Sequence, residues 1–199
     1  MRRWSRAVPA VVGAVVLTVA LTGCNGSGKS GEKGGDKSGS SSSSEDKTTF
    51  KLGEASPTQT NDGAKAKGKW TVTPTKVETG TVEDMENSGL EKDKKDGPQV
   101  PVFVSSTLKH QSGDPMEIGD MNDDLIVKTD KDKRTRELIV LMGDAKWKNC
   151  PTTDTEKKLK PGDQEKICGV FLVPEGQKPA AVELSRGFNS PPLEWPVKG

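Results

Sequence analysis

The chain has 199 residues, of which 30% are apolar and only 4% are aromatic. Its 30 basic and 29 acidic side chains nearly cancel, so it lacks the basic excess with which proteins neutralise nucleic-acid phosphates. We therefore expect no nucleic-acid partner. The low apolar content is sufficient for one modest core rather than two.

The first 23 residues are typical of an export signal. Three arginines fall within the first six positions, and no charged residue occurs from position 7 to position 23. The apolar run Val8–Leu21 is shorter than the ~20 residues that a membrane-spanning helix needs. It ends in small residues suited to a signal peptidase. We expect residues 1–23 to be removed as a signal peptide, with an uncleaved anchor helix as the alternative.

The tetrapeptide Leu21-Thr22-Gly23-Cys24 matches a lipobox. Cleavage before Cys24 leaves an N-terminal cysteine whose thiol can take a diacylglycerol and whose amine can be acylated. Two or three acyl chains hold a protein on a membrane firmly, whereas one holds it only marginally. The sequence therefore predicts a lipoprotein on the extracytoplasmic face of the cell membrane, lipidated at Cys24. Three arginines leave with the signal, so 27 basic residues remain against 29 acidic ones.

The segment after Cys24 is predicted to be a disordered tether. Asn25 to Thr49 contains no apolar side chain, and six glycines and eight serines fill fourteen of its 25 positions. Such a composition cannot bury enough surface to offset the entropy of ordering it. A Gly/Ser-rich coil of this length has an r.m.s. reach of about 25–30 Å. Between Phe50 and Gly68 only Phe50 and Leu52 offer apolar groups for docking, so we expect the tether to span residues 24–68.

From Lys69 onward, short apolar runs alternate with turn residues, and no long window shows the 3.6-residue apolar period of a helix. The runs are Trp70–Val77, Val100–Val104, Leu125–Val127, Leu138–Leu141, Val170–Val173, Ala181–Leu184 and Leu193–Val197. Turn residues separate them at Gly97-Pro98, Ser112–Pro115, Asp130–Lys133 and Lys160–Asp163. This pattern predicts an all-β, antiparallel sandwich over residues 69–199. The charged stretch Glu83–Asp96 is expected to hold at most a turn of helix.

Four segments of this region carry a resemblance to a known family. They are Gly68-Lys69-Trp70-Thr71-Val72, Val102-Phe103-Val104, Leu159-Lys160-Pro161-Gly162 and Val170–Gly176. Their arrangement resembles a family of actinobacterial surface lipoproteins whose C-terminal domain is immunoglobulin-like (telokin-like) and of uncharacterised function. The resemblance implies a single immunoglobulin-like sandwich, with Cys168 on the central strand that follows the Leu-x-Pro-Gly turn. It implies no catalytic residue.

The three cysteines divide into one lipidation site and one pair. With Cys24 acylated, Cys150 and Cys168 remain, and an even pair in an exported chain is most simply a disulfide. Closing a loop of nineteen residues, it would stabilise the fold by roughly 3 kcal/mol. A two-cysteine metal site is the alternative, but the chain has one histidine and no CxxC spacing to complete it.

Candidate catalytic residues are few. His110 is the only histidine, and no G-x-S-x-G nucleophile elbow occurs. A triad that uses His110 is not ruled out by the sequence, but we expect this side chain to face solvent at the end of a strand. No catalytic residue is assigned, and no cofactor is expected.

An acidic cluster is the best candidate for a metal site. It comprises Asp114, Glu117, Asp120, Asp123 and Asp124. Asp120 to Asp124 matches the first five positions of a calcium loop, but Leu125 stands where that loop needs glycine and Lys131 where it needs glutamate. A solvated acidic connection is therefore favoured over a calcium site, and no metal ligand is assigned.

Two tryptophans have competing interpretations. Trp195 and Trp147 could each be an exposed anchor for a partner or a buried core residue. In a domain with so few aromatic side chains, the core is favoured for Trp195. Trp147 lies between Lys146 and Lys148, and both interpretations stay open for it.

Together these features predict a lipid-anchored envelope protein that acts as a non-enzymatic interaction or structural module. Its expected partners are the membrane, through the lipid, and an envelope protein or a cell-wall component. A lipoprotein that binds a small ligand or a cation is the first alternative. An envelope hydrolase is the second.

Overall fold

The computed structural model describes residues 47–63, 66–90, 97–140 and 145–198. The expected signal peptide, the lipidation site Cys24 and the tether residues 25–46 lie outside the described residues. Within those ranges the chain consists mostly of antiparallel strands with two short helices, which confirms the prediction of an all-β, immunoglobulin-like sandwich.

The first sheet has four strands in the order β1-β2-β3-β8. They are β1 (Gln59–Asn61), β2 (Gly68–Thr79), β3 (Gln99–Gly113) and β8 (Gln164–Pro174). All neighbours pair antiparallel. The long β2–β3 ladder shifts register after Pro74, where proline offers no N–H to the ladder. β8 lies at the end of this strand order, so one of its edges faces away from β3.

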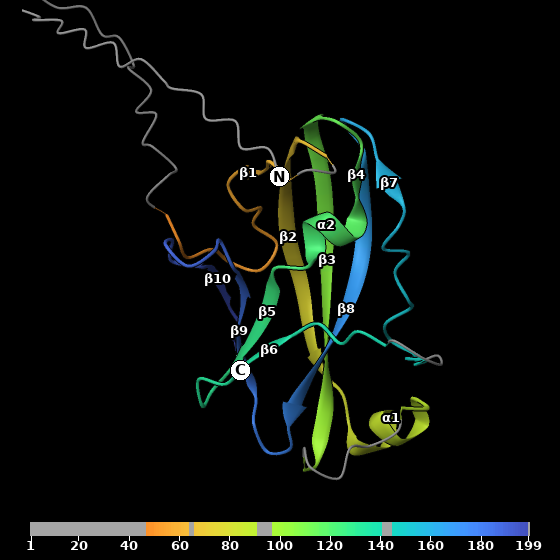
Figure 1. The fold of residues 1–199 in the computed structure, drawn as a ribbon. Coiled ribbons are helices and arrows are strands. Elements are labelled where there is room, and N and C mark those ends of the chain that lie inside the picture. The colour runs from red at the N-terminus through yellow and green to blue at the C-terminus, as the bar shows by residue number, and fades with distance from the viewer. Residues whose placement is uncertain (1–46, 64–65, 91–96, 141–144, 199) are drawn as a thin grey trace, which may run out of the picture. The chain divides into compact units, whose positions relative to one another are not determined.

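The second sheet has the strand order β10-β9-β5-β6. Its strands are β10 (Leu193–Pro196), β9 (Pro179–Leu184), β5 (Leu125–Thr129) and β6 (Arg134–Arg136). A small third sheet pairs β4 (Met116–Glu117) with β7 (Lys158–Leu159). Helix α1 (Val82–Asn87) is capped at its N-terminus by Thr81, which forms a capping box with Asp84. Helix α2 (Ile118–Asn122) leads into β5. Figure 1 shows the long strands β2, β3 and β8 as one layer, with β5, β9 and β10 beside them.

The core fills the space between the two main sheets. Alternate residues of β3, among them Val102, Val104 and Leu108, are buried there, as expected for a strand with one face on a core. Phe171 of β8 and Trp195 of β10 are the largest fully buried aromatic side chains. The expectation that Trp195 is a core residue is therefore confirmed.

A second apolar cluster lies on the opposite face of the first sheet. It centres on Phe103, Val170 and Cys150, and the partly buried Trp147 packs against it. The rings of Phe103 and Trp147 meet edge to face, with their centroids 5.6 Å apart, a favourable aromatic geometry. Trp147 thus serves packing, on a cluster outside the main core.

The ordered domain begins well before Lys69. Thr49 forms a parallel bridge with Glu194 of β10, Phe50 is buried in the core, and residues 59–61 form β1. The expectation of a disordered tether up to Gly68 is therefore wrong for the described residues from 47 to 68. The physical reason is that backbone hydrogen bonds to Glu194 and stacking of Phe50 near Trp195, at a centroid distance of 5.5 Å, compensate for the low apolar content.

Two further expectations about strands need correction. The described part of the Leu138–Leu141 run, residues 138–140, is not a strand, although Leu138 N donates to Val170 O of β8 at 2.7 Å. Cys168 does lie on the strand after the Leu159–Gly162 turn, but that strand is β8, at the edge of its sheet and not at its centre. Four further strands, β1, β4, β6 and β7, have only two or three residues each, too few to show an apolar alternation in the sequence.

Candidate functional site

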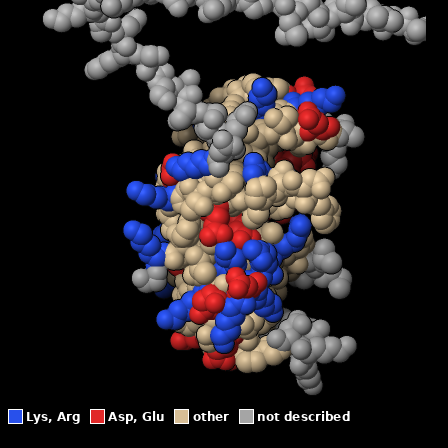
Figure 2. Space-filling model, turned by 90° about the vertical axis from the view of Figure 1, so that its left-hand side faces the viewer, with Lys and Arg blue, Asp and Glu red and all other residues tan. Residues whose placement is uncertain are grey.

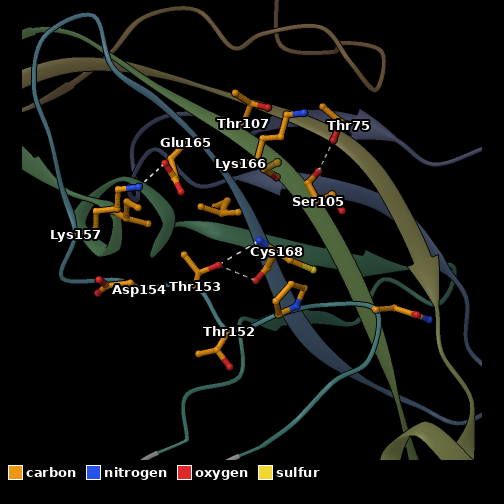
Figure 3. A pocket seen from close by; sticks show the side chains of 15 residues that line it. Thr75, Ser105, Thr107, Thr152, Thr153, Asp154, Lys157, Glu165, Lys166 and Cys168 are labelled. Carbon is orange, nitrogen blue, oxygen red and sulfur yellow. Dashed lines mark hydrogen bonds and ion pairs between the residues drawn. The ribbon is translucent and has the colours of Figure 1, made fainter.

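A groove of about 780 Å³ runs along β8, where the loop from Asn149 to Lys157 lies beside the first sheet. Its walls come from β3, β8 and this loop (Figure 3). Six of the lining residues carry hydroxyl groups: Thr75, Ser105, Ser106, Thr107, Thr152 and Thr153. Hydroxyl side chains, which both donate and accept hydrogen bonds, thus account for six of the fifteen residues that line the groove.

Two residues of this loop, Cys150 and Thr153, hold it to Cys168 of β8. Cys150 and Cys168 form a disulfide with their Cα atoms 5.4 Å apart, which confirms the predicted pairing. The Thr153 hydroxyl accepts a hydrogen bond from Cys168 N at 3.2 Å and donates one to Cys168 O at 3.3 Å (Figure 3). Because these contacts occupy backbone groups on the free edge of β8, they also protect that edge from pairing with another strand.

Several polar side chains that line the groove are paired within the domain. The Thr75 hydroxyl donates to Ser105 O at 3.0 Å, and Lys157 Nζ lies 2.7 Å from Glu165 Oε2. Ser106 is 2% exposed, and its hydroxyl has no partner among the described residues. A buried hydroxyl without a hydrogen bond is energetically unfavourable. Ser106 lies on the core side of β3, opposite Ile167 of β8, so its hydroxyl is an unsatisfied group of the interior and not part of the groove surface.

The site residues expected from sequence lie elsewhere. His110 is completely buried in β3, with Nδ1 3.0 Å from Leu159 O and Nε2 3.0 Å from Ser112 O. The expectation that it faces solvent is therefore wrong. Gly68 allows the His110 ring to be buried, because a Cβ at position 68 would lie only 3.0 Å from His110 Nε2. Glycine leaves room for the ring, and backbone carbonyl oxygens lie within hydrogen-bond distance of its two nitrogens.

The five acidic residues of the candidate metal site spread over different elements. Asp114 accepts a hydrogen bond from Lys67 N at 3.2 Å, and Glu117 lies 3.5 Å from Lys158 Nζ. Asp123 follows helix α2, and burial together with the neighbouring Asp120 and Asp124 carboxylates raises its pKa. Within the described ranges, no three His, Cys, Asp or Glu side chains are arranged to hold a metal ion.

Sequence reasoning missed a half-buried carboxyl group, that of Glu137. It accepts a hydrogen bond from the Asn122 side-chain amide, and burial raises its pKa to about 7. Asn122 itself is buried, and its Oδ1 atom has no partner in the described part of the chain. No motif surrounds Glu137, so only the packing of the residues after β6 against β8 shows that it is enclosed.

The outer face of the second sheet carries a network of charged side chains. Glu183 is only 1% exposed, and Arg134 donates to both of its oxygens, at 2.7 and 3.1 Å. Lys128 lies 3.4 Å from Glu183 and 2.6 Å from Glu194. These acids raise the pKa of Lys128, through Glu194 first, and that of Arg134, through Glu183. Figure 2 shows basic and acidic side chains intermingled on this side of the molecule.

The described residues thus define a disulfide-bonded β-sandwich of the immunoglobulin-like class. No family model matches the chain, and no curated protein matches it. Among solved structures it is similar to a secreted protein of Mycobacterium tuberculosis, MPT63, with a TM-score of 0.50 and 15% identity over 76% of this chain and 98% of that one. It also matches an uncharacterised β-sandwich protein of Clostridium difficile 630, with a TM-score of 0.44 and 13% identity over 76% and 95% of the two chains.

The similarity to MPT63 supports the sandwich fold that the resemblance implied. At 15% identity it supports the fold alone. No helix in the described ranges is long and apolar enough to cross a membrane.

Proposed function

We propose that this chain is a lipid-anchored, extracytoplasmic binding module that holds a glycan of the cell wall in the groove along β8. The observation that carries the proposal is the groove itself, to which Ser105, Thr107 and Thr152 bring hydroxyl-bearing side chains. Sugar hydroxyls donate and accept hydrogen bonds, as serine and threonine do, and the fastened loop holds one wall of the groove in place.

The cellular location in this proposal rests on the export signal, the lipobox at Cys24 and the disulfide. A disulfide of this kind forms and persists in oxidising compartments outside the cytoplasm. The similarity to a secreted protein is consistent with such a location.

The proposal assigns no catalytic activity to the module. Both ring nitrogens of His110 face backbone carbonyl oxygens inside the domain, each at 3.0 Å, so this side chain is not positioned as a general base for a substrate. The two alternatives have less support. For a cation-binding lipoprotein, the five acidic residues of the candidate metal site lie on different elements. For an envelope hydrolase, His110 does not line the groove.

Binding to isolated peptidoglycan tests the proposal. Thr107 and Lys166 are register partners on β3 and β8 and both line the groove, so Thr107→Val with Lys166→Ala should weaken co-sedimentation at least ~tenfold, given the loss of several hydrogen bonds.

The matched control uses Thr60 and Lys69, which are register partners on β1 and β2 away from the groove. Thr60→Val with Lys69→Ala should bind peptidoglycan as the unaltered protein does. Absence of binding by the unaltered protein, or equal binding by both variants, would overturn the proposal.

A further inference from the structure

The loop between β9 and β10 presents an aromatic side chain directly to solvent. Phe188 is fully exposed, with a relative accessibility of 109%. The base of the loop is closed by Arg186, whose Nε and Nη2 atoms donate to Pro191 O at 3.0 and 2.8 Å. Ser185 N also donates to Asp124 O at 2.9 Å. Phe188 therefore stands at the tip of a loop that is held at its base by hydrogen bonds.

This loop lies at the end of the domain where the N-terminal segment enters. Thr49 bridges Glu194 in parallel orientation, and backbone hydrogen bonds join Glu194 N to Thr48 O and Phe50 N to Glu194 O, at 2.7 and 2.8 Å. Because residues 48–50 run parallel to β10, the chain before them leaves at the end where the loop enters β10. In Figure 1 the start of the orange segment and the blue loop after β9 lie close together at this end.

We propose that the loop from Ser185 to Pro192 is a membrane contact, with Phe188 inserting into the interfacial region of the lipid bilayer. The inference rests on the proposed function, because it takes Cys24 as the anchor. Lys47 is 23 residues from Cys24, and a Gly/Ser-rich chain of that length reaches about 25–30 Å. The domain is then confined to a thin shell above the bilayer, with this loop on the side from which the tether departs.

Aromatic insertion, and not charge attraction, is the basis of this contact. Arg186 and Lys47 are offset at this end by Asp123, Asp124 and Glu54. Lys47 is already paired with Glu54, and the Arg186 guanidinium is engaged by Pro191 O. An aromatic ring contributes favourably at a membrane interface without charge. Tethering raises the effective concentration of the loop at the bilayer, so a single ring is enough to bias the orientation of the domain.

The test places a fluorescent reporter at the tip of the loop. The chain from Cys24 onward, coupled through the Cys24 thiol to a maleimide phospholipid, is incorporated into phosphatidylcholine vesicles that contain bromine-labelled acyl chains. Cys24 is the one thiol available, because Cys150 and Cys168 are joined. In Phe188→Trp the bromine should quench most of the emission of the added indole, equally at low and high salt.

Ile139→Trp is the matched control. Ile139 is 75% exposed, and its neighbour Leu138 donates a backbone hydrogen bond to Val170 of β8, which belongs to the first sheet and not to the sheet that carries the loop. Its added indole should not be quenched by bromine. Equal quenching in the two variants, or no quenching of the indole at position 188, would overturn the membrane contact. Because the chemical anchor replaces acylation, these results do not depend on natural lipidation. Failure of the native protein to partition into detergent would instead contradict the anchor.

Discussion

Asn122 donates a hydrogen bond from its side-chain amide to the carboxyl group of Glu137, and thereby joins helix α2 to the segment that follows β6. The same segment forms a bridge between Glu137 and Phe171 of β8. Glu137 therefore lies where a connection from the second sheet reaches the edge of the first. Burial of its carboxyl group links the stability of this junction to pH.

The free energy of unfolding should decrease as the pH is raised from about 4.5 to above 7, because of Glu137. Burial raises its pKa from the ordinary value of 4.5 to about 7, so the folded state binds a proton that the unfolded state releases. The stabilisation is fully present below pH 4.5 and is lost as the pH rises through 7. Glu137→Gln should remove about 2–3 kcal/mol of this pH dependence, measured by urea unfolding at pH values on either side of this range. Glu156→Gln, at an exposed loop position, should leave the dependence unchanged.

Removing Arg134 should destabilise the domain through Glu183. Arg134→Gln leaves a buried carboxylate without its bidentate partner, and Lys128 compensates for only one of its oxygens. Because Arg134 is 51% exposed, we expect a loss of about 1–3 kcal/mol rather than the full cost of a buried pair. The double variant with Glu183→Gln should recover much of the loss in thermal unfolding. Arg136→Gln on the same strand should change stability by less than ~0.5 kcal/mol.

Phe50→Ala should destabilise the domain by about 3–4 kcal/mol, as expected for a buried phenylalanine. Its ring lies 5.5 Å from that of Trp195, and the substitution opens a cavity beside the tryptophan. Chemical denaturation measures the change, with the exposed neighbour Lys51→Ala as the control. A near-neutral Phe50→Ala would show that the segment before β1 is not part of the folding unit.

Cys24→Ser should remove the acylation site, so the protein should be released from membranes or accumulate as the unprocessed precursor. Detergent phase partitioning and the mass of the mature N-terminus measure the two outcomes. Normal processing together with unchanged partitioning into detergent would contradict the lipoprotein assignment.

The strands that could be predicted from sequence are those with an apolar side facing the core. Burial of one strand face can be read from the alternating Val102 and Val104 in β3. It can also be read from the compact apolar run Val170–Val173 in β8. Phe50 was recognised as able to dock, but its segment is ordered by hydrogen bonds to the Glu194 backbone. Such bonds depend on a partner more than 140 residues away and leave no pattern in the local sequence.

The candidate site was much less predictable. The Cys150–Cys168 disulfide could be inferred from the export signal and from the even number of cysteines left after lipidation. The groove beside it could not, because its hydroxyl groups come from several separate segments of the chain. Ser105 and Thr153 come together only because the β3–β8 register places Ser105 opposite Cys168, whose backbone holds the Thr153 hydroxyl. His110 shows the same limit, since its burial depends on the missing side chain of Gly68 and on carbonyl groups of other segments.

The Cys150–Cys168 bond has a consequence for where the module can work. Reduction would remove the covalent link of the loop to β8 and leave the Thr153 hydrogen bonds and the Lys157–Glu165 ion pair to hold that wall of the groove. A chain in a reducing compartment would thus lack the covalent link that fixes this wall of the groove. Under the proposed function, the groove would acquire its fixed shape only after export and oxidation, in the compartment where cell-wall glycan lies.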